Sequence, residues 1–249
     1  MHWARQRERY RAVLAGTECV HPGSVFDPIS ARIAEDIGFE VGMFAGSVAS
    51  MTVLGAPDLI VLTLSEFAAQ AHRICRAGSL PLMVDADHGY LLPIAEGVGK
   101  MRAALAGRQD KSLTIIGRTS APGVTGLDDT IARAKAYEAA GVDALFFVGV
   151  RTRAELEAIH AEVKLPLMLG TASGDLRDRA WLGRTGARIC LLGHQPFMAA
   201  IKTVHDTLKA IRDGACPDTL PGVAPKDLLD RVTRDADYRR WMGEYLGGG

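Results

Sequence analysis

The chain has 249 residues, of which 48% are hydrophobic and 23% charged, and its acidic and basic residues balance to a formal net charge of zero. The length suits one large α/β domain over residues 1–249, with a C-terminal helical extension from about 203 to 249. A balanced charge gives no electrostatic reason to expect nucleic acid or an anionic membrane as a partner. Because no apolar run could span a bilayer and the polar amino terminus lacks the core of a signal peptide, we expect a cytoplasmic protein.

Short apolar runs alternate with amphipathic segments along the chain. Strands are predicted at Glu18–His21, Val41–Ala45, Pro81–Asp85, Leu113–Arg118, Asp143–Val148, Pro166–Leu169 and Ala187–Leu192. Helices are predicted between them at Ser30–Ile37, Ser65–Ala77, Glu96–Ala106, Leu127–Ala140, Arg153–Val163 and Leu176–Thr185. Such alternation indicates parallel strands joined by helical crossovers. Since no glycine-rich phosphate-binding motif follows an early strand, we expect a TIM-type (βα)8 barrel with its site at the carboxyl ends of the strands.

The strand count falls one short of a barrel. Seven strands are found where the closed fold has eight. The pattern breaks after Tyr90, where Leu91-Leu92-Pro93 runs almost directly into the next helix. By itself this count is only a small irregularity, because strand boundaries are predicted here from a single sequence.

The most informative stretch is Asp85-Ala86-Asp87-His88-Gly89-Tyr90, which follows the apolar run that ends at Val84. Two carboxylates at the end of a buried strand suit a divalent cation such as Mg²⁺, which commonly takes one or two protein carboxylates and leaves positions for substrate oxygens. A solvated turn with capping carboxylates is the alternative. His88 beside them is more simply a histidine without a metal role.

Other polar residues follow other predicted strands, and each has a structural alternative. Ser47 lies in a small-residue turn that could bind a ligand or simply cap a helix. Asp58 lies in a loop, where an aspartate usually forms a turn. Arg118 ends a strand and could bind a substrate carboxylate or pair with a neighbour such as Asp85. His194 follows the last strand and suits substrate contact or proton transfer.

Taken together, these residues suit a small oxo-acid whose reaction passes through an enolate. Their motifs also resemble a known family. The matching segments cover nearly the whole chain in order: Val25–Arg32, Gly46–Ser50, Pro57-Asp58, Asp85–Tyr90, Ile115–Thr119 and Gly193-His194. The chain resembles the isocitrate lyase/phosphoenolpyruvate mutase superfamily, and within it the oxaloacetate decarboxylase family. The resemblance implies a Mg²⁺-dependent barrel, with Mn²⁺ as an alternative metal, that releases CO₂ from oxaloacetate to give pyruvate.

The resemblance also implies roles for single residues. Asp85 matches the metal-binding aspartate, while Asp87 and Asp58 match acids that hold the metal or its waters. Ser47 matches a serine whose backbone and hydroxyl contact the substrate.

Two further residues carry over. Arg118 matches the arginine that binds the substrate carboxylate, and His194 the histidine that distinguishes this branch. The chain departs from the family at Ser120, where relatives usually have an aspartate.

A larger departure lies after Tyr90, where relatives continue with a βα unit, on the order of 30 residues, that carries a glutamate and a gating loop. Either the printed sequence leaves residues out here, which we favour, or the chain has a true deletion. A lyase on another 2-hydroxy or 2-oxo diacid, resembling methylisocitrate lyase, and a catalytically impaired oxo-acid-binding barrel remain alternatives. The lyase branches carry a catalytic cysteine in that loop, and it has no counterpart here.

The carboxyl-terminal part, residues 203–249, is expected to add two or three helices. In the superfamily a late helix is exchanged between subunits, which implies a homotetramer built as a dimer of dimers. The segment Tyr238-Arg239-Arg240-Trp241-Met242 resembles such a docking piece, and packing on its own barrel is an equal alternative.

Overall fold

The strands of the protein are parallel and form two sheets in the computed structural model, which describes residues 3–59, 61–86, 91–171 and 174–246. The first sheet has the order β1-β2-β3 and the second the order β4-β5-β6-β7. Their bounds are β1 Gly23–Ser24, β2 Gly42–Ala45, β3 Leu82–Asp85, β4 Ile116–Thr119, β5 Ala144–Phe147, β6 Leu167–Leu169 and β7 Ala187–Cys190.

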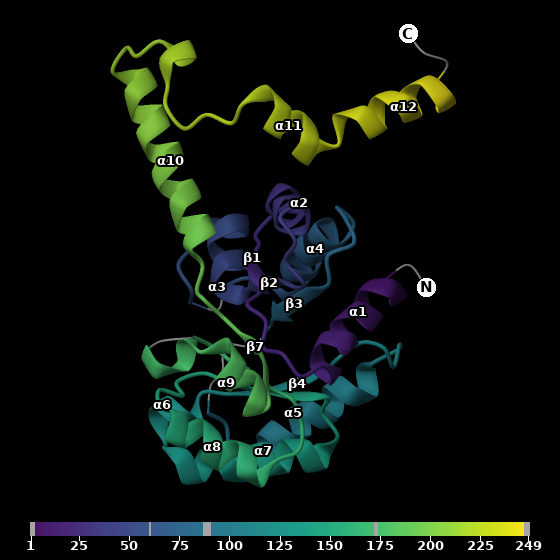
Figure 1. Ribbon diagram of the computed structural model, residues 1–249, viewed down its shortest axis with the longest axis vertical. Helices are drawn as coiled ribbons and strands as arrows, with labels where there is room; N and C mark the ends of the chain where they lie inside the picture. The colour runs from purple at the N-terminus through teal and green to yellow at the C-terminus, as the bar shows by residue number, and fades with distance from the viewer. Residues whose placement is uncertain (1–2, 60, 87–90, 172–173, 247–249) are drawn as a thin grey trace.

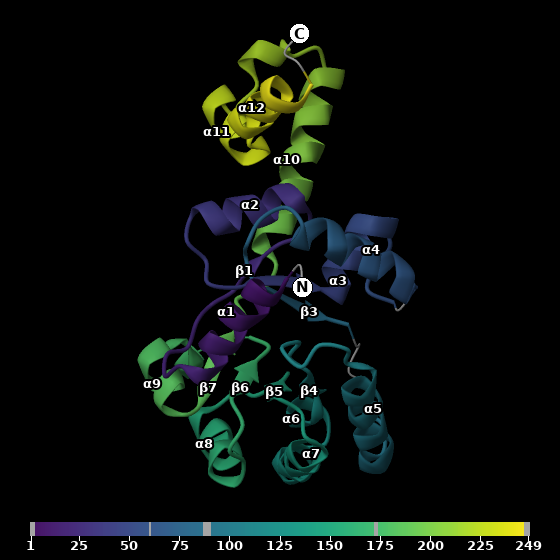
Figure 2. The same ribbon diagram turned by 90° about the vertical axis from the view of Figure 1, so that its right-hand side faces the viewer.

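One side of the barrel is closed by the segment that precedes β1. Val20 forms a parallel bridge with Ile189 of β7. Its N–H donates to the Arg188 carbonyl at 2.9 Å, and its carbonyl accepts from the Cys190 N–H at 3.0 Å. On the opposite side, no strand pairing joins β3 to β4 among the residues that the structure describes. The fold is thus a TIM-type α/β barrel that is open where the sequence predicts a missing unit (Figures 1 and 2).

Helices surround both sheets, with α2, α3 and α4 beside the first and α5 to α9 beside the second (Figure 1). Their bounds are α1 Ala4–Ala15, α2 Pro28–Asp36, α3 Gly46–Ala49, α4 Leu64–Cys75, α5 Ile94–Gly107, α6 Ala121–Val124, α7 Leu127–Ala140, α8 Arg153–Glu162, α9 Arg179–Arg184, α10 Gln195–Arg212, α11 Lys226–Thr233 and α12 Asp235–Tyr245. A π-helical turn covers Ser50–Leu54, and short 3-10 turns cover Gly174–Arg177 and Pro217–Thr219.

Local sequence signals explain where several helices begin. Asp27 caps α2, its side chain accepting from the Ser30 N–H at 2.7 Å while the Ser30 hydroxyl accepts from the Asp27 N–H at 3.0 Å. Proline at the first helical position adds to this cap. The same reciprocal pattern starts α4 at Thr63 and α8 at Thr152. These signals account for the starts of α2, α4 and α8. The helix predicted at Leu176–Thr185 is shorter than expected, because a 3-10 turn at Gly174–Arg177 precedes α9, which Asp178 caps.

The prediction for the first strand was wrong. It placed the strand at Glu18–His21, whereas the structure has β1 at Gly23–Ser24 and only the Val20 bridge before it. Two neighbouring segments pair with different strands here. Val20 pairs with β7, and β1, which begins at Gly23, pairs with β2. A single-sequence pattern does not distinguish the two.

The strands bury both faces, as parallel strands covered by helices do. In β5, Ala144 and Phe146 face the barrel interior, while Leu145 and Phe147 pack under the surrounding helices. Tyr10 of α1 joins the interior cluster, so α1 contributes to the inside of the barrel. Residues from both sheets meet in that interior: Met43, Ala45, Met83, Met168 and Ile189. The two sheets therefore share one core despite the open wall.

The last three helices leave the barrel (Figure 1). None of the residues of α10, all of which are described, is buried. α11 returns to α2, where Val232 is buried and the Arg32 guanidinium donates to the Val232 and Thr233 carbonyls at 3.1 and 3.0 Å. Within α12, Tyr238 and Trp241 are 52% and 42% exposed, so this segment does not pack on its own barrel.

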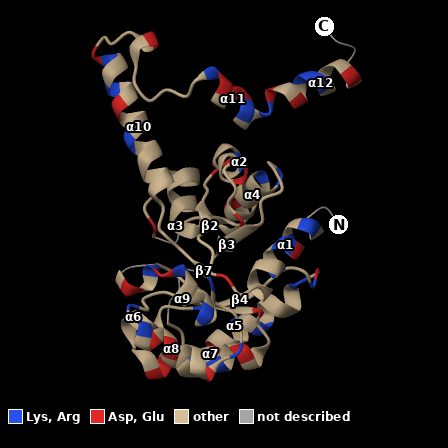
Figure 3. Cartoon of the chain, viewed as in Figure 1, with Lys and Arg blue, Asp and Glu red and all other residues tan. Residues whose placement is uncertain are grey.

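The surfaces of these helices mix charges of both signs, as Figure 3 shows along α10 to α12. Each of the following ion pairs joins residues four apart in the sequence: Lys202 with Asp206, Lys209 with Asp213, Lys226 with Asp230, and Asp235 with Arg239. Within the described ranges, no helix combines the length and apolarity needed to cross a membrane.

Candidate active site

Five of the predicted site residues line one cavity of about 190 Å³: Ser47, Asp58, Asp85, Arg118 and His194. They come together because parallel strands deliver their carboxyl ends to the same rim of a barrel. The walls between them are apolar and include Met43, Phe146, Val148 and Leu191. The sixth predicted residue, Asp87, lies outside the described residues, as does His88.

Asp85 and Arg118 face each other across the open wall. Asp85 is the last residue of β3, Arg118 lies in β4, and the Arg118 Nε lies 3.7 Å from the Asp85 Oδ1. The guanidinium also lies over the Phe146 ring, 5.8 Å from its centroid. Arg118 can pair with Asp85 and still bind a carboxylate, because a guanidinium has five N–H donors. Both roles left open by the sequence are therefore compatible with this geometry.

A residue that was not predicted from the sequence positions the His194 ring through a hydrogen bond. The His194 Nδ1 lies 2.9 Å from the hydroxyl of Ser24, a buried residue of β1. Burial lowers the pKa of His194, and the nearby Asp58 charge opposes that shift only in part. His194 is thus an uncharged imidazole at neutral pH, with Nε2 as the ring nitrogen left for other partners.

Ser24 was missed because the first strand was placed too early, which left Ser24 in a presumed loop. The run Gly23-Ser24-Val25 directly before the Asp27 cap of the next helix was the available signal.

Ser47 and Asp58 reach the cavity from the segments that follow β2. Ala45, the last residue of β2, occupies the N-cap position of α3, so Ser47 lies inside the helix and does not cap it. Its neighbour Gly46 also lines the cavity, which brings main-chain N–H groups of the first helical turn close to a ligand. Asp58 follows Gly55, whose φ of 65° turns the chain out of the π-helical turn. The loop aspartate thus lies at the cavity, whatever its role in the turn.

The cavity residues fit a divalent cation of the Mg²⁺ type. Two carboxylates, Asp58 and Asp85, line it, and Mg²⁺ commonly takes one or two carboxylates, several waters and substrate oxygens. Within the described ranges, no three side chains of the His, Cys, Asp and Glu types gather as a ready-made metal cage. The donor set therefore suits an open, water-rich ion rather than a closed structural one.

Comparison with known proteins agrees with this site. The family model described as phosphoenolpyruvate phosphomutase matches residues 12–92 and 90–212, two segments that meet at the junction after Tyr90. The chain is 48% identical to an oxaloacetate decarboxylase of Bradyrhizobium diazoefficiens and 46% identical to one of Rhodopseudomonas palustris, in both cases over 99% of each chain. Each alignment has 285 positions, 36 more than the chain has residues, so at least 36 positions of the relatives have no counterpart here.

Solved structures agree on the fold. Phosphonopyruvate hydrolase in complex with oxalate and Mg²⁺ superposes with a TM-score of 0.83 at 22% identity, over 97% of this chain and 99% of that one. Oxaloacetate acetylhydrolase in complex with 3,3-difluorooxalacetate superposes with a TM-score of 0.84 at 21% identity, over 99% of this chain and 98% of that one. From its motifs, its fold and its matched segments, the chain belongs to the phosphoenolpyruvate phosphomutase family.

Proposed function

We propose that this protein is a carbon–carbon lyase that decarboxylates oxaloacetate to pyruvate and CO₂. The observation that carries the proposal is the convergence of Ser47, Asp58, Asp85, Arg118 and His194 on one cavity, in a chain 48% identical to an oxaloacetate decarboxylase. A cavity of about 190 Å³ suits a small dianionic substrate, and its cationic wall at Arg118 suits a carboxylate. A cytoplasmic location stays a prediction.

In the proposed reaction, the C3–C4 bond of oxaloacetate breaks, CO₂ leaves, and the electron pair stays as the enolate of pyruvate until C3 takes a proton from solvent or an acid. Arg118 binds a substrate carboxylate, and Ser47 donates hydrogen bonds to the oxo-acid end. His194, uncharged and fixed by Ser24, contacts the substrate without adding a positive charge. Mg²⁺ or Mn²⁺, held by Asp85 with Asp58 and Asp87 on its waters, would stabilise the negative charge that develops on the oxo-acid.

The proposal is tested by pyruvate release from oxaloacetate with and without Mg²⁺, for the parent chain and for Asp85→Ala. We expect a rate above the metal-catalysed background for the parent, and a loss of at least about 100-fold for the variant, the scale of removing a main electrostatic contributor. Equal rates at background for both proteins would contradict it. In that case oxalate binding, measured by calorimetry, would identify an impaired oxo-acid-binding barrel.

A lyase on a larger diacid, resembling methylisocitrate lyase, is the second candidate. None of the four cysteines, all described and all free thiols, lines the cavity: Cys19, Cys75, Cys190 and Cys216. The described part of the site therefore contains no thiol that could donate a proton, which favours decarboxylation of oxaloacetate over cleavage of a larger diacid. Pyruvate release from methylisocitrate distinguishes the two candidates.

We also infer a homo-oligomer, a tetramer in which α10 is exchanged between subunits. The support is the apolar face of α10, whose members recur at three- and four-residue spacing and are all more than two-fifths exposed: Met198, Ile201, Val204, Leu208 and Ile211. A helix with such a face buries it against a partner.

A further inference from the structure

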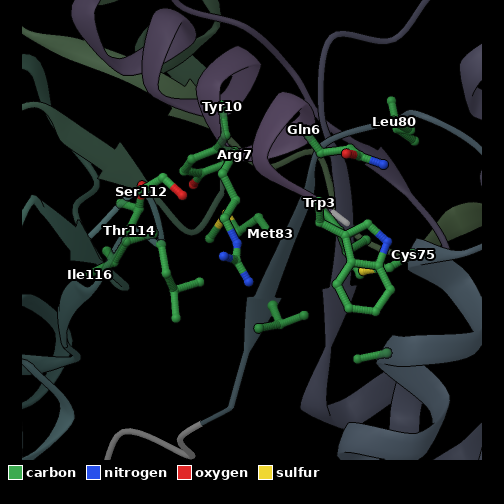
Figure 4. Close-up of a pocket in the computed structure, with 14 residues that line it drawn as sticks. Trp3, Gln6, Arg7, Tyr10, Cys75, Leu80, Met83, Ser112, Thr114 and Ile116 are labelled. Atoms are coloured by element: carbon green, nitrogen blue, oxygen red, sulfur yellow. The ribbon is translucent and has the colours of Figure 1, made fainter. Parts of the chain in front are cut away.

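The open wall of the barrel contains a second cavity, of about 250 Å³, which we name the slot. It lies between β3 and the segment 112–116, and it shares no lining residue with the active-site cavity. Figure 4 shows Arg7, from the amino-terminal helix, near Met83, and Trp3, the cap of that helix, beside Cys75. Most of the lining is apolar, so the slot is a gap in the hydrophobic wall rather than a polar pocket.

Both sides of the slot are strand edges. The Gly42 N–H donates to the Pro81 carbonyl at 2.8 Å, so the alternate residues Leu82 and Val84 direct their main-chain groups away from β2 and toward the slot. On the other side, the Asp143 N–H donates to the Ile115 carbonyl at 2.8 Å, so Thr114 and Ile116 likewise direct theirs away from β5. Two parallel edges therefore face one another with a slot between them.

The side chains at the edges are also incompletely covered. Val84 is 41% exposed and Leu113 is 40% exposed. The Thr114 hydroxyl is buried without a hydrogen-bond partner among the described residues. Proteins normally cover or pair such edges, because exposed main-chain groups next to apolar side chains readily bind another strand.

We propose that the slot is a strand-accepting site. It binds a strand in parallel to both edges, and the occupant is the segment at the relatives' unmatched positions, presented as a separate polypeptide. At least 36 positions of the relatives have no counterpart in this chain, enough for a βα unit of roughly 30 residues. The family match divides at residues 90–92, between β3 and α5, which is the connection that such a unit would occupy.

The chemistry of the occupant follows from the lining. A strand placed here has an edge on each side and apolar walls on both faces, so it needs a near-continuous apolar run of four to six residues. Main-chain hydrogen bonds to two edges would supply affinity, as in peptides that extend a sheet. The proposal concerns binding alone and holds whether or not the barrel decarboxylates oxaloacetate.

The test uses a labelled peptide that copies the unmatched segment of the Bradyrhizobium diazoefficiens relative, titrated into the full chain and followed by fluorescence anisotropy. We expect saturable binding, and slower hydrogen exchange at Leu82, Val84, Thr114 and Ile116. Val84→Asp, at an exposed slot position, should weaken binding at least tenfold. Val124→Asp, at a 70% exposed position on α6 that does not line the slot, should not.

Circular dichroism of each variant establishes that it is folded before titration. A folded parent that does not bind the peptide, or that binds a scrambled peptide equally well, would overturn the proposal. So would binding without protection of the four edge amides. Pyruvate release is measured separately, so a loss of activity is not mistaken for a failure of the slot.

Discussion

The contact between Ser24 and His194 is the smallest feature on which the site depends. Ser24→Ala would leave the partly buried Nδ1 of His194 without its partner, which costs about 1–3 kcal/mol. We expect kcat for oxaloacetate to fall roughly tenfold or more, while KM changes less because Arg118 still binds the carboxylate. Ser24→Thr keeps the hydroxyl and should retain most activity. Unchanged kinetics for Ser24→Ala would show that the contact does not position the imidazole.

The lowered pKa of His194 also links stability to pH. Because burial lowers the pKa in the folded protein, the unfolded chain takes up the proton first as pH falls below about 6.5. His194 therefore costs no stability at higher pH and destabilises the fold progressively below that value. Thermal melts from pH 7.5 to pH 5.5 should show a shallower decline for His194→Gln than for the parent. Parallel declines would contradict the buried, neutral imidazole.

At the scale of elements, the C-terminal helices are held to α2 by an ion pair. The guanidinium of Arg234 lies 2.7 Å from the Asp36 carboxylate, and this contact holds the pKa of Asp36 below its usual value. The stabilisation is present above the usual carboxyl pKa, about 4, and is lost as pH falls through the lowered folded value.

A double-mutant cycle of Asp36→Asn and Arg234→Gln measures this contact in urea unfolding. We expect a coupling of about 0.2–1 kcal/mol at pH 7, the range of ion pairs at a protein surface, and a smaller one at acid pH. Arg234 has a positive φ of 62°. Gln and Arg are both non-glycine residues, so the substitution leaves the backbone strain at this position about the same. A coupling that grows on acidification would contradict the assignment.

At the scale of the whole molecule, the apolar face of α10 predicts the assembly. Val204 and Leu208 are 57% and 63% exposed. The double substitution Val204→Glu/Leu208→Glu should convert the oligomer to monomers in light scattering, because buried charges in an apolar interface are not compensated. Lys202→Gln, on the charged side of the same helix, should leave the oligomer intact. A monomeric parent chain would contradict the inferred assembly.

The open wall is the other property of the whole molecule. Asp85 and Arg118 contact each other across it at the carboxyl end, while the slot lies below them between the same strands. At the active-site rim, this ion pair connects β3 and β4, where a closed eight-stranded barrel has a further strand between them.

Much of this protein was determined by the sequence alone. The alternation of elements predicted the barrel, the polar residues after Val84 and Gly117 predicted part of the site rim, and the break after Tyr90 predicted the place where a βα unit is absent. These features are local, because a cap such as Asp27 with Ser30, or an apolar run that ends in Asp85, is encoded within a few neighbouring residues.

Only the tertiary structure decided the rest. Ser24 and His194 are 170 residues apart, and Val20 joins Ile189 only when the barrel closes on that side. Whether Arg118 meets Asp85, and whether the face of α10 is covered, likewise depends on how distant elements pack. A local sequence pattern limits the interactions that a residue can make. The packing of elements far apart in the chain determines which partner it contacts.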